Sequence, residues 1–566
     1  MARNFNQSNN RFNQAVFFGD PVATGPITVT ASGVISETFA GSALRLDGGA
    51  YTLAINGLIS ATGASFNGVE MGAPAAATPN QVSTVTIGAT GELYGRVNAF
   101  VAFHAVNLSN AGLMDGGSGA YIQGGTVAYT VANTGEINVD PVNYAIWTDG
   151  AGTHTITNSG TITGRIEGSF TSASVELITN SGTILGPIYA RGGADQVTNA
   201  GLIGGPVYLD DGDDRLLNTG TIQGDVNGWT GIDTITNNSQ ITGNVISGDQ
   251  NDIVTNTGTI GGNIAAGTGN DVFTNTGGIV EQWIFMGEGR DTMTGGAGRD
   301  QVADEEGNDR YTLGDGVDNV DAVGTGSATG TDRFDGGLQT GSNPLLGLYG
   351  DEYNASDATT ATVINLNAAA ATDSVTGIVH AGAKVTGAET GIDLIAGFET
   401  AYTGTGNDVI LGNTDANFLS GGDGADHLFG NGGSDFVQGG TGADFLSGGA
   451  GLDVLDAGID TDLDTILYTA LSDSRIARGG RDVLLNFTDA DRIDFGNMVI
   501  AGGTVDHYVG TDVAFDAFAG AVRVVTTALG WLIQLDSNGD LVADMSIDVT
   551  DALHTGVTDW SDQFLF

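Results

Sequence analysis

The sequence predicts an all-β protein: a long right-handed parallel β-solenoid with a β-sandwich-like domain at its C-terminal end. A nonapeptide repeats six times in frame from Thr403 to Asp456, and a different, longer unit repeats upstream of it. The 93 glycines, against 8 prolines, recur at fixed offsets. Fixed periods of this kind are typical of coils stacked on one another. Strands rich in Thr, Ile and Val between Gly- and Asn-rich turns favour β-structure, not helix.

Residues 1–26 read as an N-terminal arm, rich in Asn and Gln with spaced phenylalanines. Such a segment either docks onto a neighbouring copy as a donated strand or stays a disordered tail. Residues 27–285 are predicted to form the solenoid, with coils of 19–25 residues that are longer where side loops bulge out. The solenoid and the shorter-period repeats that follow it are expected to form one continuous stack, because their regular coils differ in length by one residue.

A T-N-x-G-x-I motif marks the solenoid coils, and degenerate copies at Leu108 and Val131 extend it towards the N-terminus. Its asparagines are expected to stack in a column of hydrogen-bonded amides, as in cross-β ladders. The column comprises Asn158, Asn180, Asn199, Asn218, Asn237, Asn256 and Asn275.

An aspartate precedes five of these asparagines by four residues, in a turn of the form G-x-G-x-D. Carboxylate and carbonyl oxygens are the ligands that Ca²⁺ prefers, so this row is a candidate one-sided calcium row. The alternative is a set of Asx turns without metal. The row comprises Asp195, Asp214, Asp233, Asp252 and Asp271.

Nonapeptide spacing first appears over residues 286–321, where it places Asp291, Asp300, Asp309 and Asp318 in equivalent positions. Residues 322–402 lack the repeat and are predicted to be a β-rich insert packed on the side of the solenoid. The repeat returns over 403–461 in the form G-G-x-G-x-D-x-U-x, in which U is a large apolar residue. The U residues are expected to point inwards; they are Ile410, Leu419, Leu428, Val437, Leu446 and Leu455.

This pattern resembles the RTX (repeats-in-toxin) family, and it implies that the solenoid continues into a calcium-loaded RTX β-roll exported by type I secretion. Two nonapeptides make one coil, so equivalent residues of alternate nonapeptides stack. Asp408, Asp426 and Asp444 form one predicted column, and Asn417, Asp435 and Asp453 form the other. Turn glycines at the same spacing complete the predicted metal sites; they are Gly404, Gly406, Gly422, Gly424, Gly440 and Gly442.

Charge couples these columns to folding, because acids outnumber bases 67 to 17 and the net charge is −50. Carboxylates on stacked strands about 4.8 Å apart repel each other by roughly 3–4 kcal/mol at an effective dielectric of 20. Multiple Ca²⁺ ions would convert this repulsion into folding energy. The repeats are therefore expected to stay unfolded in low-calcium cytoplasm and to fold outside the cell. The same charge excludes nucleic acid as a partner.

Residues 462–566 have fewer glycines, and the segment from Asp464 to Met498 resembles the C-terminal secretion domain of serralysin-type proteins. The terminal DQFLF resembles a type I export signal. The segment from Met1 to Gly25 contains no apolar run typical of a signal peptide, and no stretch has transmembrane length. The expected location is extracellular or at the cell surface, with the type I secretion machinery as a partner. The absence of cysteine agrees with this location.

No catalytic site is predicted. H-E-x-x-H is absent, so the zinc site of true serralysins is missing, and the six histidines are scattered. Asp536–Asp544 resembles an EF-hand loop, but its glycine is misplaced, and a hairpin turn is the preferred interpretation. Side loops at Val69–Val82 and Pro141–Thr153 are the places where a catalytic site would escape this search.

The sequence therefore predicts a non-enzymatic structural protein of the bacterial cell surface. Its calcium-stabilised solenoid would self-associate into a filament, surface layer or extracellular matrix, with a cell-surface polysaccharide as a further candidate partner. One alternative is a polysaccharide lyase or epimerase, marked by a side groove lined with Arg, Asp, Tyr and His. Another is an adhesin, which needs an exposed aromatic platform; the candidates are Trp147, Trp229 and Trp283.

Overall fold

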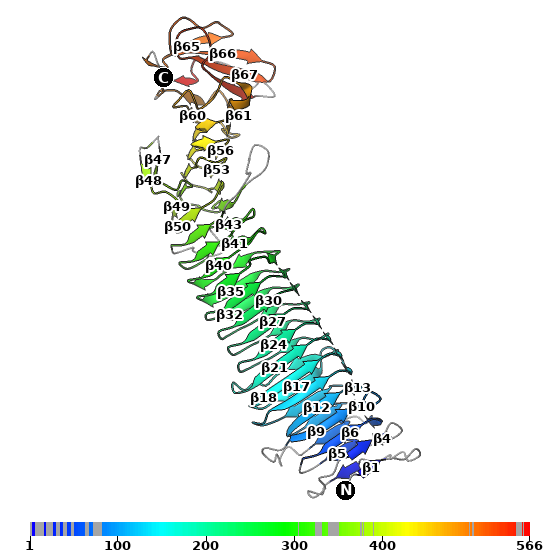
Figure 1. Ribbon diagram of the computed structural model, residues 1–566. Helices are drawn as coiled ribbons and strands as arrows, with labels where there is room; N and C mark the ends of the chain where they lie inside the picture. The colour runs from blue at the N-terminus through cyan, green and yellow to red at the C-terminus, as the bar shows by residue number, and fades with distance from the viewer. Residues whose placement is uncertain are drawn as a thin grey trace. The chain divides into compact units, whose positions relative to one another are not determined.

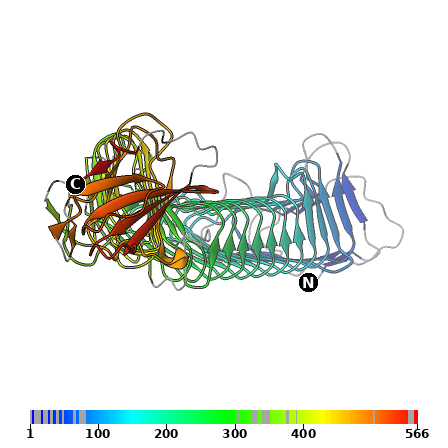
Figure 2. The same ribbon diagram turned by 90° about the horizontal axis from the view of Figure 1, so that it is seen from above.

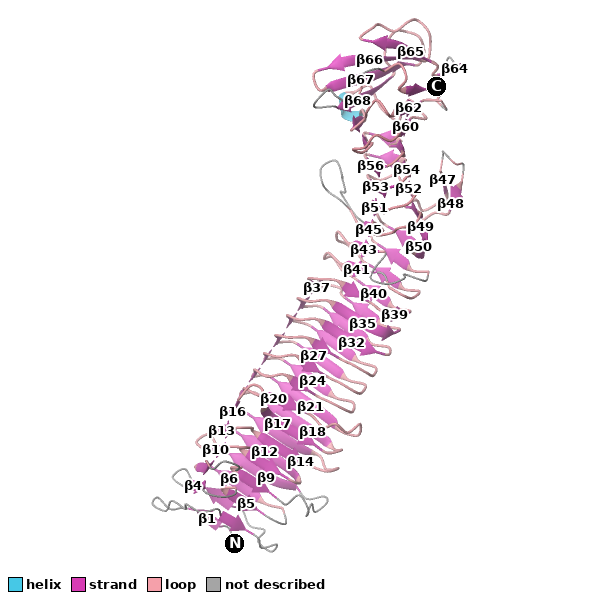
Figure 3. Ribbon diagram, turned by 180° about the vertical axis from the view of Figure 1, so that it is seen from behind, coloured by secondary structure: helices cyan, strands magenta, loops and turns pink. Residues whose placement is uncertain are grey.

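Strands dominate the protein (Figures 1 and 3). The computed structural model describes residues 3–5, 16–18, 27–29, 34–37, 42–46, 50–62, 67–71, 82–303, 305–322, 331–337, 350–373, 376, 378–388, 390–496, 498–500, 503–550, 557 and 560–566. They fold as unit 1 (Met1–Trp283) and unit 2 (Ile284–Phe566). In the described part of the chain the only helical element is a 3₁₀ turn, η2 (Arg478–Gly480), and no helix is long and apolar enough to span a membrane. The all-β prediction is confirmed.

Unit 1 is a stack of parallel coils, seen in Figure 2 as successive turns, and each coil places one short strand on each of three faces. A representative coil has β27 (Arg215–Asn218) on face A, β28 (Thr221–Ile222) on face B and β29 (Val226–Asn227) on face C. Face B is a 12-stranded parallel sheet that runs from β4 (Val34–Glu37) to β37 (Ile279–Val280). Strand partners in the regular coils lie one repeat period apart, as Leu216 and Ile235 do, so the sequence period sets the register.

Inward-facing side chains stack into continuous apolar columns along unit 1. On face B the column is fully buried and consists of Ile162, Ile184, Ile203, Ile222, Ile241 and Ile260. Face-B strands here are only two residues long, and each places one residue inwards and one partly outwards. A one-residue slip would exchange these two faces, which explains why the short strands hold a single register.

A buried asparagine column accompanies face A of unit 1, as predicted. Each side-chain Nδ2 donates to the Oδ1 of the asparagine in the next coil at 2.8–2.9 Å. The column starts at Asn110 and Asn133, in the degenerate copies of the motif, and ends at Asn275. It satisfies buried polar groups along the stack, so it is a structural ladder.

The predicted N-terminal arm contains two strands of the stack itself. β1 (Arg3–Phe5) pairs in parallel with β3 (Ile27–Val29), and β2 (Val16–Phe18) pairs with β5 (Leu44–Leu46). These segments are neither a disordered tail nor a strand offered to a neighbour, because the chain's own sheet already holds them. The rest of the arm, residues 6–15 and 19–26, lies outside the described residues.

Unit 2 contains the coils of the nonapeptide repeats, with two strands per coil. One face carries β52 (Val409–Leu411), β54 (His427–Phe429) and β57 (Phe445–Ser447). The other carries β53 (Phe418–Asp423), β56 (Phe436–Thr441) and β59 (Val454–Asp456). Partners lie two nonapeptides apart in parallel register, and all six predicted inward residues, from Ile410 to Leu455, are fully buried.

The predicted insert over 322–402 lies only partly on the side of the roll. β44 (Arg333–Asp335) and β50 (Gly391–Ala396) extend one face in parallel register, and β45 (Glu352–Asn354) and β51 (Thr400–Tyr402) extend the other. A side hairpin, β47 (Ala371–Thr372) with β48 (Val379–His380), agrees with the prediction. The sequence reasoning missed these coils because their length departs from the nonapeptide period.

The roll also continues past its predicted end at residue 461. β60 (Thr465–Leu467), β61 (Val483–Leu485) and β62 (Arg492–Asp494) each pair in parallel with a strand of the preceding coil. Beyond them, β66 (Ala521–Thr527), β67 (Gly530–Asp536) and β68 (Met545–Thr550) form an antiparallel sheet. Asp536–Asp544 is the connection between β67 and β68, which confirms the hairpin interpretation.

Candidate metal centre

The aspartates of the nonapeptide repeats stack in two columns, one on each side of the roll. In the first, the backbone N–H of Asp408 donates to Oδ1 of Asp426 at 2.8 Å, and Asp426 donates in the same way to Asp444 at 2.9 Å. In the second, Asn417 donates to Asp435 and Asp435 to Asp453, both at 2.8 Å. The predicted membership of both columns is therefore found in the structure, with Asn417 in an aspartate position.

Each column leaves a buried carboxylate oxygen unpaired. The Oδ2 atoms of Asp408, Asp426, Asp435, Asp444 and Asp453 are buried and accept no hydrogen bond. A buried anionic oxygen without a protein partner is costly, so its recurrence in successive coils marks positions that suit a cation.

Glycine turns shape the space beside these oxygens. A Cβ at Gly421 or Gly439 would collide with Oδ2 of the aspartate five residues later, Asp426 or Asp444. A Cβ at Gly424 would overlap the carbonyl oxygen of Gly406, the stacked glycine of the preceding coil. The repeat therefore needs glycine here to bring carboxylate and carbonyl oxygens together. The predicted glycines occupy these stacked turns: Gly404, Gly422 and Gly440, and Gly406, Gly424 and Gly442.

The buried aspartates titrate far above their ordinary range. Burial, with a smaller contribution from the neighbouring carboxylates Asp444 and Asp408, raises the pKa of Asp426 to about 8. Burial and the charge of Asp453 raise the pKa of Asp435 to about 9. Backbone hydrogen bonds oppose both shifts without cancelling them. Without a cation, the folded roll therefore favours protonated carboxyls.

The first repeat block forms aspartate columns of the same kind. Asp291 donates its N–H to Asp309 at 2.7 Å, and Asp300 donates to Asp318 at 2.8 Å, so these four predicted residues also form two columns. The second column passes through the predicted insert: Asp318 donates to Asp351, and Asp351 to the carboxylate of Glu399 at 3.1 Å. Burial raises the pKa of Asp351 to about 8.

Six buried carboxylates of these columns escaped the sequence reasoning: Asp332, Asp351, Glu399, Asp464, Asp482 and Asp491. Most lie in coils of irregular length, where a period search loses its frame. The usable signal is local, because each carboxylate directly precedes a three-residue strand whose middle residue is buried, as Asp482 precedes β61.

Unit 1 carries one further column on its own. Asp195 donates its N–H to Oδ1 of Asp214 at 2.6 Å, and the pattern repeats through Asp233 and Asp252 to Asp271 at 2.7–2.8 Å. Asp195, Asp214, Asp233 and Asp252 each keep a buried, unpaired Oδ2. Burial, the charge of Asp233 and other nearby carboxylates raise the pKa of Asp214 to about 8. These hydrogen bonds join aspartates 19 residues apart, so they are not the local bonds of Asx turns, and they satisfy only one oxygen of each carboxylate.

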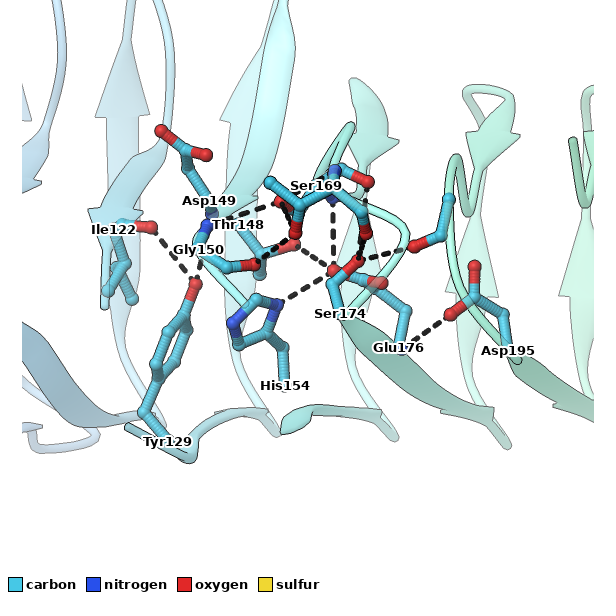
Figure 4. Close-up of polar contacts among 12 residues, drawn as sticks. Ile122, Tyr129, Thr148, Asp149, Gly150, His154, Ser169, Ser174, Glu176 and Asp195 are labelled. Atoms are coloured by element: carbon cyan, nitrogen blue, oxygen red, sulfur yellow. Dashed lines mark hydrogen bonds and ion pairs between the residues drawn. The ribbon is translucent and has the colours of Figure 1, made fainter. Parts of the chain in front are cut away.

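The N-terminal end of this column is built differently (Figure 4). Glu176 takes the next position and donates its N–H to Asp195 at 2.7 Å. Its fully buried carboxylate lies 2.7 Å from Nδ1 of His154, and Oε1 also accepts from Thr148 and from the N–H of Ser169. The chain thus provides a titratable nitrogen and two neutral donors for Glu176. All three contacts fall on Oε1, and Oε2 of Glu176 is buried and unpaired, as are the Oδ2 atoms of the four aspartates that follow.

This chemistry fits Ca²⁺. Hard oxygen donors, carboxylate plus backbone carbonyl, converge in glycine turns that exclude side chains, which suits the flexible, oxygen-rich coordination of Ca²⁺. Among the described residues no group of three or more His, Cys, Asp or Glu side chains gathers at one point. Each site would instead draw one or two carboxylates from a column and its remaining oxygens from the turns.

The RTX calcium-binding nonapeptide repeat family matches the chain in four copies, over residues 287–320, 395–428, 402–437 and 429–464. No curated protein matches the chain. The copies cover both repeat blocks of unit 2 and none of unit 1. The chain therefore carries RTX-type nonapeptide repeats, which bind Ca²⁺.

Proposed function

We propose that the protein is a secreted structural component of the bacterial cell surface, whose solenoid folds on calcium and assembles into a filament, surface layer or matrix. The observation that carries the proposal is the set of aspartate columns with unpaired buried oxygens in both units. These columns run through the coils from Asp195 to Asp491. Calcium would therefore act on most of the chain and not only on an appended segment.

Calcium would determine when the chain folds. Without the ion, the raised pKa values of Asp214, Asp426 and Asp435 oppose the folded, ionised state at neutral pH. The ion would supply the missing charge in a calcium-rich medium, and binding energy would become folding energy. This logic suits export of an unfolded chain by the type I machinery, followed by folding outside.

Assembly is supported by the ends of the parallel sheets. Among the described residues β4 is the last strand of face B, as β1 and β2 are the last strands of faces A and C, and parallel edges carry backbone N–H and C=O groups able to pair with another strand. Stacked-repeat proteins usually protect such ends with dedicated caps.

The test is electron microscopy and analytical ultracentrifugation of the purified full chain, unfolded in chelator and then given Ca²⁺. We expect compact, ordered polymers that disperse when the chelator returns. Mg²⁺ is the matched control, because it prefers tight octahedral geometry and retains its waters, so it should not replace Ca²⁺.

Two results would contradict different parts of the proposal. A chain that folds on Ca²⁺ yet remains monomeric would remove assembly and leave the calcium-folding step. A chain that folds equally well in chelator or in Mg²⁺ would remove the calcium dependence itself.

A further inference from the structure

Unit 1 has a surface pocket that the calcium columns do not use. Its volume is about 240 Å³, and it is lined by Phe170, Arg191, Gly192, Asp210, Asp211 and Trp229. Two of the lining side chains are large aromatic rings held in solvent: Phe170 is 66% exposed and Trp229 is 55% exposed. Exposed rings that share one hollow with charged groups are typical of a binding site, not of a core.

Trp229 occupies a backbone position that suits it poorly. Its φ is 74°, in the left-handed region, and the equivalent residues of neighbouring coils share this conformation: Arg191 at 83°, Asp210 at 70° and Gly248 at 119°. Bulky residues are strained in this region, and glycine is not. Since the indole is mostly exposed, burial does not offset the strain. A strained, exposed aromatic residue in a position that glycine would fit indicates a role in function.

Phe170 reaches the pocket from an insertion. The strand pairs Ile166–Ile188 and Ile178–Val197 bound equivalent segments of two successive coils. The first segment is the longer of the two, and its extra residues form the bulge that contains Phe170. The insertion thus places the Phe170 ring in the same pocket as the Trp229 indole, which belongs to a later coil.

Arg191 fixes the polar side of the pocket. Its guanidinium lies 4.6 Å from the ring centres of both Phe170 and Tyr189. Its Nε donates to Glu167 at 2.8 Å and its Nη1 to Asp210 at 3.1 Å. The Arg191 guanidinium is therefore held in one orientation, and two carboxylates balance its charge. This favours hydrogen bonding to a neutral ligand over binding of an anion.

An aromatic strip leads away from the pocket along face C. Tyr121, Trp147, Glu167, Tyr189 and Tyr208 are register partners in five successive coils of this face. Tyr189 and Tyr208 stack at 4.7 Å, and Tyr121 and Trp147 lie 4.6 Å apart. Buried Glu167 separates the two aromatic pairs of the strip. Because each coil adds one residue, the strip follows the solenoid axis and suits an extended polymer better than a compact molecule.

We propose that this pocket and strip bind a neutral polysaccharide chain built of pyranose rings. Phe170 and Trp229 would stack against the apolar C–H face of a sugar, while Asp210, Asp211 and Arg191 would hydrogen-bond its hydroxyl groups. The net charge of −50 disfavours uronate polymers as ligands. The proposal does not rest on assembly, since a monomer would bind in the same way.

The test is isothermal titration of the full-length, calcium-loaded protein with cellohexaose, laminarihexaose and mannohexaose, and separately with alginate. We expect at least one neutral hexaose to bind and alginate not to bind. Trp229→Gly and Phe170→Ala should each weaken binding by roughly tenfold or more, as for truncated aromatic anchors. The melting temperature of Trp229→Gly should be equal to or above that of wild type, since glycine relieves the strained φ.

Phe518→Ala is the matched control, because Phe518 is 70% exposed in unit 2 and its loss should leave binding unchanged. The proposal fails if none of the three hexaoses binds, or if both pocket variants bind as wild type does. Binding or depolymerisation of alginate would overturn it in favour of a uronate-active site. Hexaose binding by protein that remains monomeric would support it whatever the outcome for assembly.

Discussion

At the residue scale, two buried carboxylates at the N-terminal end of the unit 1 column have different hydrogen-bond partners. Glu176 is fully buried and has the imidazole of His154 and two neutral donors around its carboxylate. Asp195, one coil further, is equally buried, and burial together with the charge of Glu176 raises its pKa to about 9. Each carboxylate still has one buried oxygen without a partner, Oε2 of Glu176 and Oδ2 of Asp195, so the candidate metal row does not stop at Asp195.

Asp426→Asn tests a single position of the roll. The amide oxygen can still accept the N–H of Asp408, as Asn417 shows that an amide fits this kind of site, but the anionic ligand is lost. We expect a lower calcium stoichiometry and weaker binding by calorimetry. In chelator at pH of about 9, above the pKa of about 8, the variant should be more stable than wild type, because a buried charge is removed.

Asp423→Asn removes the same charge from an exposed residue on the adjacent turn and serves as the control. It should bind calcium as wild type does. Equal calcium binding by Asp426→Asn and wild type would rule out a ligand role for Asp426.

At the scale of the element, the coil is the unit of stability in unit 1, and the asparagine ladder ties each coil to the next. Asn218 accepts from Asn199 at 2.9 Å and donates to Asn237 at 2.8 Å and to the carbonyl of Gln240 at 3.0 Å. Its side chain is fully buried. The loss of one rung therefore leaves donors and acceptors in two coils without partners.

Asn218→Ala should lower the free energy of unfolding of unit 1 by about 2–3 kcal/mol, the range for leaving buried polar groups unsatisfied. Hydrogen exchange followed by mass spectrometry should show the faster exchange concentrated in the adjacent coils, since each coil contacts mainly its neighbours. Asn238→Ala, at the exposed position that follows the ladder residue Asn237 in the next coil, is the control and should change stability little. Exchange that rises uniformly across both units would contradict this local picture.

At the scale of the whole molecule, calcium should reverse the dependence of stability on pH. The folded pKa values of about 8 for Asp214 and Asp426 and about 9 for Asp435 lie far above their ordinary value of 3.8. The folded chain without calcium therefore holds protons more tightly than the unfolded chain. Its stability is fully present below about pH 4 and is lost as the pH rises through about 8–9.

With calcium, the ion needs the ionised carboxylates, so stability should instead rise over the same range of pH. Urea midpoints measured across this range, with Ca²⁺ and with chelator, check the prediction. Two parallel curves would show that the columns do not couple metal binding to folding.

The regular part of the candidate site was open to prediction because a constant period decides which residues stack. Asp408, Asp426 and Asp444 recur in every second nonapeptide, and equivalent aspartates of unit 1 recur once in each longer repeat, so both columns follow from counting. Glu399 and Asp351 were not predictable in this way. Their coils depart from the period, and only the folded chain shows that these two positions coincide.

The sequence by itself determined the parallel stack, its inward apolar columns, the asparagine ladder and the calcium chemistry of the repeats. Each depends only on residues at equal intervals, and a solenoid converts an interval directly into a contact. The tertiary structure alone decided the rest: the coils within residues 322–402, the Glu176–His154 end of the unit 1 column, and the placing of Phe170 and Trp229 in one pocket. These depend on bulges and unequal coils, whose closure is set by three-dimensional packing and not by the period.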